Sequence, residues 1–436
     1  MDYSPGVEME LKKHAIEIGD TIEIEKDDSS YRGMIMPNTG DPDILVLKLG
    51  NGYNVGLSLE GASIRKISGV KPKIMTSQKK DHEKFDKSKP LVALITTGGT
   101  ITSKIDYATG GVTSLMTPDE FIRKTPEIGE IANITIDQPF TKMSEDMDYE
   151  DWALLAEEVA NRLNRGAAGA IITHGTDTLH YTSAALSFMI KTTKPVVIVG
   201  SQRSTDRGST DSAMNLICAA YAATSDIAEV GVCMHSSIND DACYFMRGTK
   251  VRKMHASRRD AFRPINDLPL AKIHPSGNIE VMNDFRKRSE GKAEADARFE
   301  PRIALQKVYP GSDPEILEYL ASKYKGVVLE ATGFGHVPTH SQRSWIPTIK
   351  KVAQEIPVVV STQTIYGRVN TNVYSNLRIL FNETQAIPAQ DMHPETAYVK
   401  LGFVLGHVRQ IEETRKMMLT NLAGEITQRD LDAFLV

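Results

Sequence analysis

The chain has 436 residues, of which 41% are hydrophobic and 25% are charged, and its formal net charge is -5. This length predicts about two or three domains with ordinary hydrophobic cores. The negative net charge excludes an overall positive potential that would attract nucleic acid to the whole surface. Three cysteines are too few for a disulfide framework, and neither a signal region nor an apolar run of about 18 residues is present, which together predict a soluble cytoplasmic protein.

Residues 1–70 are predicted to form a small β-barrel. Four short stretches with strand-like patterns are separated by turn residues, and Asn51-Gly52 is a hairpin signal. The four stretches are residues 16–24, 31–36, 44–49 and 53–57. Short strands in so few residues are typical of closed barrels, which often bind partners or RNA. The charged, proline-containing segment 71–90 is predicted to be a linker.

Two apolar stretches run directly into glycine turns that carry threonines. Residues 91–96 lead into Thr-Gly-Gly-Thr-Ile at 97–101, and residues 170–173 lead into His-Gly-Thr-Asp-Thr at 174–178. Each pattern predicts a buried parallel strand whose carboxyl end opens toward a ligand crevice. Either turn alone is equally compatible with a simple entry into a helix. Neither turn matches a dinucleotide fingerprint or a phosphate loop.

The remainder of the chain alternates strands and helices. A helix is expected from Asp151 to Gly166 and another from about 210 to 224, and a second α/β unit begins near Ile303. Further strands are expected at residues 195–199, 229–234, 326–330 and 357–361. This alternation predicts α/β domains with mostly parallel sheets. We place a catalytic domain at 91–275, a smaller carboxyl-terminal domain at 303–436 and the connection between them at about 275–302.

Charged residues accompany the second turn. Asp177 directly follows Thr176, and Lys253 lies in a later basic segment. A lysine that deprotonates a hydroxyl or water, held in place by an aspartate, is a plausible proton-handling group. Smaller basic clusters, such as Arg258-Arg259, are weak candidates for contact with RNA.

These residues resemble a known family. The two threonine turns and the Lys253 segment are similar, in order and spacing, to the two signatures and the lysine of the bacterial-type L-asparaginases, and the resemblance extends from about residue 90 to 436. The added amino-terminal region resembles that of the D subunits of the archaeal glutamyl-tRNA(Gln) amidotransferases. The resemblance implies an asparaginase-like two-domain body with mostly parallel sheets, plus the small β-barrel.

The same resemblance implies roles for individual residues. Thr100 would be the nucleophile, activated by Tyr107, while Thr176, Asp177 and Lys253 would orient water or assist the first hydroxyl. Which threonine attacks first stays open. Backbone N–H groups at glycine turns can hold a developing oxyanion without side chains, which suggests this use for Gly98, Gly99 and Gly175.

Substrate recognition is implied at Ser144 and Glu145. Ser144 would donate to the α-carboxylate of the substrate, and Asp177 would also pair with its ammonium group. Many family members have Gln where Glu145 stands, and a solvated acidic loop is the alternative interpretation of this segment. The chain also departs at His336, where Asn is usual in a loop that, in family dimers, reaches the active site of the neighbouring copy.

The resemblance implies a glutaminase that works within a larger enzyme. It would hydrolyse glutamine through a threonyl ester and supply ammonia for the conversion of Glu-tRNA(Gln) to Gln-tRNA(Gln). The expected partners are a second copy of the chain, a kinase/transamidase partner of the E type and, through the complex, Glu-tRNA(Gln), with no membrane. No metal is expected in this chain, since Pro338 interrupts the His336 and His340 pair, and no cofactor is expected, since amide hydrolysis by hydroxyl attack needs none. ATP and Mg would bind the kinase/transamidase partner.

Two alternatives remain open from the sequence. One is a free-standing cytoplasmic L-asparaginase or glutaminase, in which residues 1–70 are incidental. The other is a non-catalytic scaffold that binds RNA or protein through its barrel. Thr100, Thr176, Asp177 and Lys253 are all present, which disfavours the scaffold.

Overall fold

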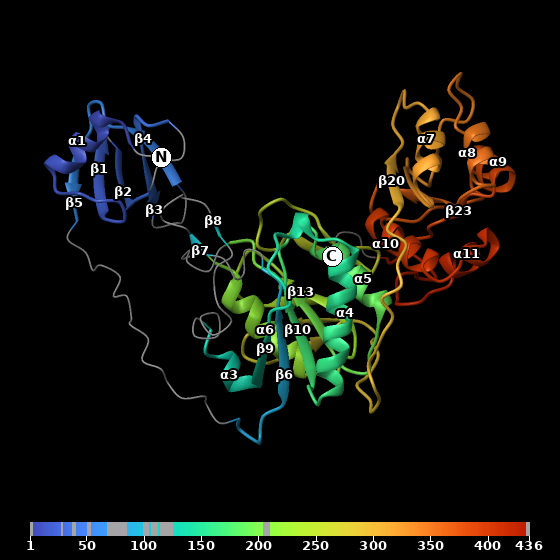
Figure 1. Cartoon of the computed structure of the whole chain (residues 1–436), viewed down its shortest axis with the longest axis horizontal. Helices are drawn as coiled ribbons and strands as arrows, with labels where there is room; N and C mark the ends of the chain where they lie inside the picture. Colours follow the sequence, from blue (N-terminus) through green and yellow to red (C-terminus); the bar gives the residue numbers. More distant parts are fainter. Residues whose placement is uncertain are drawn as a thin grey trace.

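The computed structural model describes residues 3–27, 29–36, 41–49, 54–67, 85–98, 104–105, 112–113, 125–203 and 210–432 (Figure 1). An amino-terminal antiparallel sheet, a large α/β domain and a smaller α/β domain follow one another along the chain. No helix in these ranges is both long and apolar enough to span a membrane.

The amino-terminal sheet has five strands in the order β4-β3-β2-β1-β5. Its strands are β1 (Thr21–Lys26), β2 (Ser29–Ile35), β3 (Ile44–Leu49), β4 (Asn54–Ser58) and β5 (Ser63–Lys66). Ile22 and Ile24 are buried while their neighbours in β1 are not, so the alternation of apolar and polar residues correctly predicts a strand with one buried face. Closure into a barrel stays a prediction, because β4 and β5 are the edges of the described sheet. The Asn51-Gly52 hairpin signal lies outside the described residues.

Helix α1 (Pro5–Lys13) is not predicted by the strand pattern of this region. Ser4 caps its first turn by accepting a hydrogen bond from the Val7 backbone N–H, and proline at the first helical position suits the helix start. The helix buries Val7 and Leu11 in the same cluster as the strands. Strand β1 accordingly begins at Thr21 and not at residue 16.

The large domain is built on an eight-stranded sheet in the order β18-β17-β14-β13-β12-β10-β6-β9. Its strands are β6 (Leu91–Thr96), β9 (Asn133–Asp137), β10 (Gly169–Thr173), β12 (Val196–Val199), β13 (Val230–His235), β14 (Cys243–Arg247), β17 (Ala271–Ile273) and β18 (Ile279–Val281). Strands β9, β6, β10, β12 and β13 pair in parallel, as expected. The other edge is antiparallel, which makes the sheet mixed.

Helices cover both faces of this sheet (Figure 1). They are α3 (Ile128–Ile131), α4 (Tyr149–Asn164), α5 (Leu179–Met189) and α6 (Ser212–Thr224). Successive residues of β6 point into two different cores: Ala93 and Ile95 pack with α4 and α5, while Val92 and Leu94 pack with α6. Burial on both faces explains why parallel strands are almost continuously apolar.

The carboxyl-terminal domain has a parallel sheet in the order β20-β21-β22-β23. Its strands are β20 (Ile303–Lys307), β21 (Gly326–Ala331), β22 (Val358–Thr362) and β23 (Ile387–Pro388). Its helices are α7 (Glu315–Lys323), α8 (Ile346–Val352), α9 (Ser375–Thr384), α10 (Pro394–Leu405) and α11 (Ile411–Met418). Helix α10 packs on β21 and on α5 of the large domain, so it joins the two domains.

Three two-stranded ribbons complete the described fold. They are β7 (Lys104–Ile105) with β8 (Val112–Thr113), β11 (Ile190–Lys191) with β19 (Glu294–Ala295), and β15 (Val251–Lys253) with β16 (Phe262–Pro264). The segment 275–302, expected as a connection, thus contributes β18 and β19 to sheets of the body.

Candidate active site

The turn after β10 is held by a chain of buried hydrogen bonds. Nδ1 of His174 lies 2.6 Å from the Gly175 carbonyl oxygen, and its Nε2 lies 2.8 Å from Oγ1 of Thr182. Burial lowers the pKa of His174 to about 4, so the ring is neutral near pH 7. Since a carbonyl only accepts, Nδ1 carries the proton and Nε2 accepts from Thr182, whose oxygen accepts from Nε1 of Trp152 at 3.0 Å.

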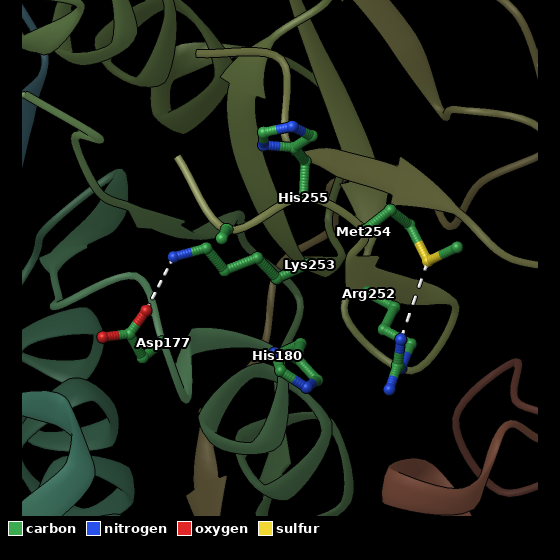
Figure 2. A pocket seen from close by; sticks show the side chains of 7 residues that line it. Asp177, His180, Arg252, Lys253, Met254 and His255 are labelled. Atoms are coloured by element: carbon green, nitrogen blue, oxygen red, sulfur yellow. Dashed lines mark hydrogen bonds and ion pairs between the residues drawn. The ribbon is translucent and has the colours of Figure 1, made fainter. Parts of the chain in front are cut away.

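Lys253 contacts Thr176 and Asp177, which lie in this turn. Its Nζ lies 2.9 Å from Oγ1 of Thr176 and 2.7 Å from Oδ1 of Asp177. The Lys253 side chain is 9% exposed and that of Asp177 is 68% exposed, so the ammonium is sheltered while the carboxylate faces solvent (Figure 2). The structure therefore brings together three of the residues predicted from sequence, from positions 76 and 77 residues apart.

Ser144 packs directly against the same turn. A Cβ added to Gly175 would lie 2.8 Å from Cβ and 2.9 Å from Oγ of Ser144, so only glycine allows this approach. Oγ1 of Thr178, the residue before α5, donates to the Ser144 carbonyl oxygen at 2.6 Å. Ser144 is 3% exposed at the start of a short 3-10 helix, Ser144–Asp146, in which Glu145 is exposed.

The turn after β6 lies beside the turn after β10. Strands β6 and β10 pair in parallel up to Thr96 and Thr173, and Oγ1 of Thr97 donates to the Thr173 carbonyl oxygen at 2.8 Å. Gly98 has φ +109°, and a Cβ there would lie 2.5 Å from the Lys142 carbonyl oxygen. The predicted residues Gly99, Thr100 and Tyr107 lie outside the described residues.

A cleft of about 290 Å³ opens beside Lys253. It is lined by Asp177, His180, Arg252, Lys253, Met254, His255 and Ala256 (Figure 2). His180, which is not among the residues predicted from sequence, lies in the first turn of α5 and is 6% exposed. Burial lowers its pKa to about 3, and its buried Nδ1 has no hydrogen-bond partner. The sequence signal for His180 is a single histidine in a helix without charged residues, four positions after Thr176.

His336, which stands where Asn is usual in the family, lies in the carboxyl-terminal domain. Its ring packs against Tyr374 with centroids 5.3 Å apart, and Thr332 and His336 form an isolated β-bridge. Within the described ranges, no group of three or more His, Cys, Asp or Glu side chains is placed to hold a metal ion.

Three family models match the chain. The amino-terminal asparaginase domain matches residues 91–286, the carboxyl-terminal glutaminase/asparaginase domain matches residues 302–418, and the GatD N-terminal domain matches residues 16–67. These matches cover all three parts of the fold.

Curated relatives match over nearly the whole length. A protein of Pyrococcus abyssi, named as the D subunit of glutamyl-tRNA(Gln) amidotransferase, is 50% identical, with 96% of each chain covered. A protein of the same name from Methanothermobacter thermautotrophicus is 44% identical over 100% of this chain and 99% of its own.

Solved structures of L-asparaginases match the body. The thermostable L-asparaginase of Thermococcus kodakarensis has a TM-score of 0.71 and 32% identity, and the match covers 78% of this chain and 100% of that chain. L-asparaginase I of Vibrio cholerae has a TM-score of 0.67 and 28% identity over 78% of this chain and 99% of its own.

Proposed function

The chain belongs to the family of glutamyl-tRNA(Gln) amidotransferase D subunits, and from that membership we propose that it hydrolyses glutamine and supplies the ammonia that converts Glu-tRNA(Gln) to Gln-tRNA(Gln). The observation that carries the chemistry is the approach of Lys253 Nζ to Oγ1 of Thr176 and Oδ1 of Asp177. A threonine hydroxyl is a poor nucleophile at neutral pH until a neighbour accepts its proton.

The proposed reaction proceeds in two steps. A threonine oxygen attacks the carboxamide carbon of glutamine, its proton passes to a base, and the C–N bond breaks as the nitrogen takes a proton and leaves as ammonia. Water then cleaves the threonyl ester, which releases glutamate and restores the hydroxyl. We assign the attack to Thr100, activated by Tyr107, and we assign the orientation of water or the assistance of the attack to Thr176, Asp177 and Lys253.

Substrate binding is proposed for the residues beside this group. Ser144 would donate to the α-carboxylate of glutamine, while Asp177 and Glu145 would face its ammonium group. The support is positional: Ser144 packs against Gly175, whose backbone N–H is a candidate donor to the developing oxyanion together with that of Gly99. The exposure of Asp177 leaves its carboxylate accessible to a ligand.

The relatives are named as subunits, so the chain works as one component of an amidotransferase complex. We propose a homodimer formed through the asparaginase-like body, joined by a kinase/transamidase partner of the E type that binds ATP and Mg. This chain would itself need no cofactor, and the complex would work in the cytoplasm.

The direct test is a glutaminase assay on the purified chain, alone and with the kinase/transamidase partner and charged tRNA. We expect weak hydrolysis alone and marked stimulation in the complex, because a site that is completed only on assembly avoids wasteful loss of glutamine. Asparagine should be the poorer substrate.

A free-standing asparaginase is the second candidate, favoured by the likeness of the body to solved L-asparaginases. Full activity of the isolated chain, equal toward asparagine and glutamine, would support that candidate and contradict ours.

A further inference from the structure

One segment of the carboxyl-terminal domain holds the residues just before Lys253. This segment, residues 391–396, follows β23 and includes the first turn of α10. Asp391 Oδ2 lies 2.5 Å from Lys250 Nζ, Glu395 Oε1 lies 2.7 Å from Arg252 Nε, and Thr396 Oγ1 donates to the Thr249 carbonyl oxygen at 2.9 Å. Three of the four residues before Lys253 are therefore bound by the other domain.

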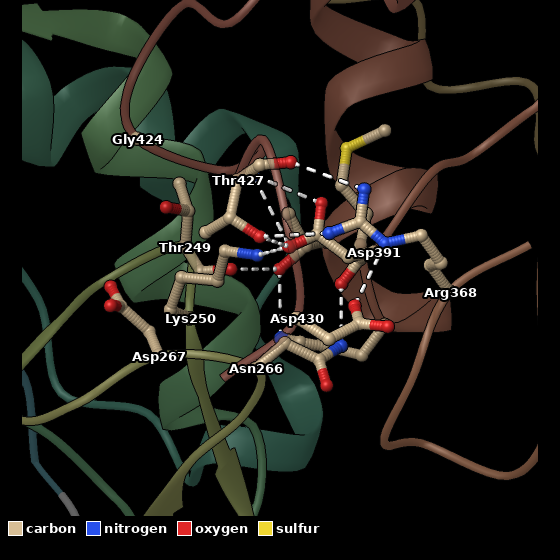
Figure 3. A network of polar contacts seen from close by, with 12 residues as sticks. Thr249, Lys250, Asn266, Asp267, Arg368, Asp391, Gly424, Thr427 and Asp430 are labelled. Atoms are coloured by element: carbon tan, nitrogen blue, oxygen red, sulfur yellow. Dashed lines mark hydrogen bonds and ion pairs between the residues drawn. The ribbon is translucent and has the colours of Figure 1, made fainter. Parts of the chain in front are cut away.

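These contacts are sheltered from solvent. The side chains of Lys250 and Asp391 are 1% and 0% exposed, and Asp391 also accepts from the Thr427 backbone N–H near the end of the chain (Figure 3). Separation of such a buried ion pair is costly, because it leaves a buried charge without compensation.

Glu395 is fixed in the same way. Its second oxygen, Oε2, lies 2.9 Å from His393 Nδ1, and His393 Nε2 lies 2.9 Å from Oγ1 of Thr396. Burial raises the pKa of Glu395, but the hydrogen bonds and charges of His393 and Arg252 outweigh burial and lower it, so the carboxylate is ionised. The Arg252 contact is thus a charge-assisted hydrogen bond.

The strand that carries Lys253 lies outside the large sheet, although Val251 at its centre is buried in the core that contains α4 and α5. Strand β15 pairs with β16 in a two-stranded ribbon and is not part of the eight-stranded sheet. An isolated two-stranded ribbon is at best marginally stable in water. The position of Lys253 at the end of β15 therefore depends on the burial of Val251 and on the contacts that hold Thr249, Lys250 and Arg252.

We infer that segment 391–396 is a positioning element for Lys253, which keeps Nζ within hydrogen-bonding distance of Thr176 and Asp177 by holding Thr249, Lys250 and Arg252. This inference rests on the proposed function for the role of Lys253. Small displacements matter in such a site, since misplacement by about 1 Å costs on the order of a hundredfold in rate.

The test compares two buried threonines of the same domain. Thr396 and Thr414 are both 0% exposed, but the Thr414 hydroxyl donates within α11, to the Gln410 carbonyl oxygen at 3.0 Å. Thr396→Val removes the contact with Thr249 and also the one with His393 Nε2, which lies within segment 391–396, and Thr414→Val is the matched control. Thr396→Ser, which keeps the hydroxyl, is the rescue variant.

Two measurements are made on the full chain with its kinase/transamidase partner: kcat and KM for glutamine, and amide hydrogen exchange of peptides that cover residues 249–254. For Thr396→Val we expect kcat to fall about tenfold or more with little change in KM, and exchange in 249–254 to rise about tenfold. Thr414→Val should leave both unchanged, and Thr396→Ser should restore most of kcat.

Unchanged exchange in Thr396→Val would overturn the inference, and so would faster exchange with unaltered kcat. If the wild-type complex does not hydrolyse glutamine, the proposed function fails, and exchange in 249–254 alone then decides whether segment 391–396 holds the strand.

Discussion

The two strands that lead to the site residues, β10 and β15, differ in the contacts that hold them in place. Strand β10, which leads to Thr176 and Asp177, lies inside the eight-stranded sheet with β6 and β12 as parallel neighbours. Strand β15, which ends at Lys253, has only β16 as a strand neighbour among the described residues. The β10 side of the site is therefore positioned by the large sheet, whereas the β15 side depends on the burial of Val251 together with contacts from the carboxyl-terminal domain.

The largest effect is expected when the threonine hydroxyl on the β10 side is removed. Thr176→Ala should lower glutamine hydrolysis about a thousandfold or more. The Oγ1 of Thr176 bonds to Lys253, and removal of one member of a set of residues that act together abolishes most of the activity of the whole set. Thr100→Ala should be as severe, and the double variant little worse. Ammonium salts should restore amidation by the complex. Glutamine-dependent activity that persists in Thr100→Ala would contradict its assignment as the nucleophile.

The second prediction tests the β15 side. Lys253→Arg should reduce kcat by about a hundredfold or more if Lys253 acts as a base, since guanidinium stays protonated throughout the working range. The measurement is hydrolysis against pH for the wild type and this variant. A sizeable residual activity with an unchanged pH profile would show that Lys253 serves only as a positive charge beside Asp177.

A smaller effect is expected from the packing of the β10 turn. Gly175→Ala places a methyl group 2.8 Å from Cβ of Ser144, and such overpacking costs about 1–3 kcal/mol. We expect a lower unfolding midpoint and a raised KM for glutamine. Gly129→Ala is the matched control, because nothing lies within 4 Å of a Cβ there. Equal midpoints for the two variants would refute the tight approach of Gly175 to Ser144.

The last prediction concerns the pH dependence of stability, which should differ between the β10 side, with its two buried histidines, and the β15 side, held by Glu395. The pKa of His180 is lowered to about 3 and that of His174 to about 4, both by burial, so below about pH 6.5 the unfolded chain binds protons that the native chain does not. Stability around the β10 turn should fall as the pH drops from about 6.5 toward 4, by up to about 1.4 kcal/mol per pH unit for each ring. Glu395 has a lowered pKa, so its contribution is lost only below its ordinary value of 4.5.

Urea unfolding of wild type and His180→Phe at several pH values measures this difference. His180 has no hydrogen bond to lose at Nδ1, and its ring packs on Tyr181 with centroids 4.8 Å apart, so phenylalanine should be accommodated. The variant should lose less stability than the wild type between pH 6.5 and 4. Parallel curves would mean that His180 does not titrate on unfolding.

Much of the large domain could be predicted from local patterns. The stretches predicted as strands, 91–96 and 170–173, match β6 and β10 to within one residue, because continuous apolar runs that end in glycine turns are typical of strands buried on both faces. Helix α1 could not be predicted in this way because its buried residues, Val7 and Leu11, give only a weak helical period. The antiparallel edge of the large sheet also escapes prediction, because strand direction depends on connections and pairing, which periodicity does not encode.

At the site, residue types and their order along the chain were enough to select Thr176, Asp177 and Lys253. Local sequence carries this information because a strand, its turn and the helix that follows are formed by neighbouring residues. The meeting of Lys253 with Thr176 across 77 residues, the place of His180 in the lining of the cleft and the contact of Lys250 with Asp391 across 141 residues depend on how whole domains pack. Burial of apolar surface and pairing of charges bring these side chains together when the domains pack. A short window of adjacent residues carries no information on such long-range contacts.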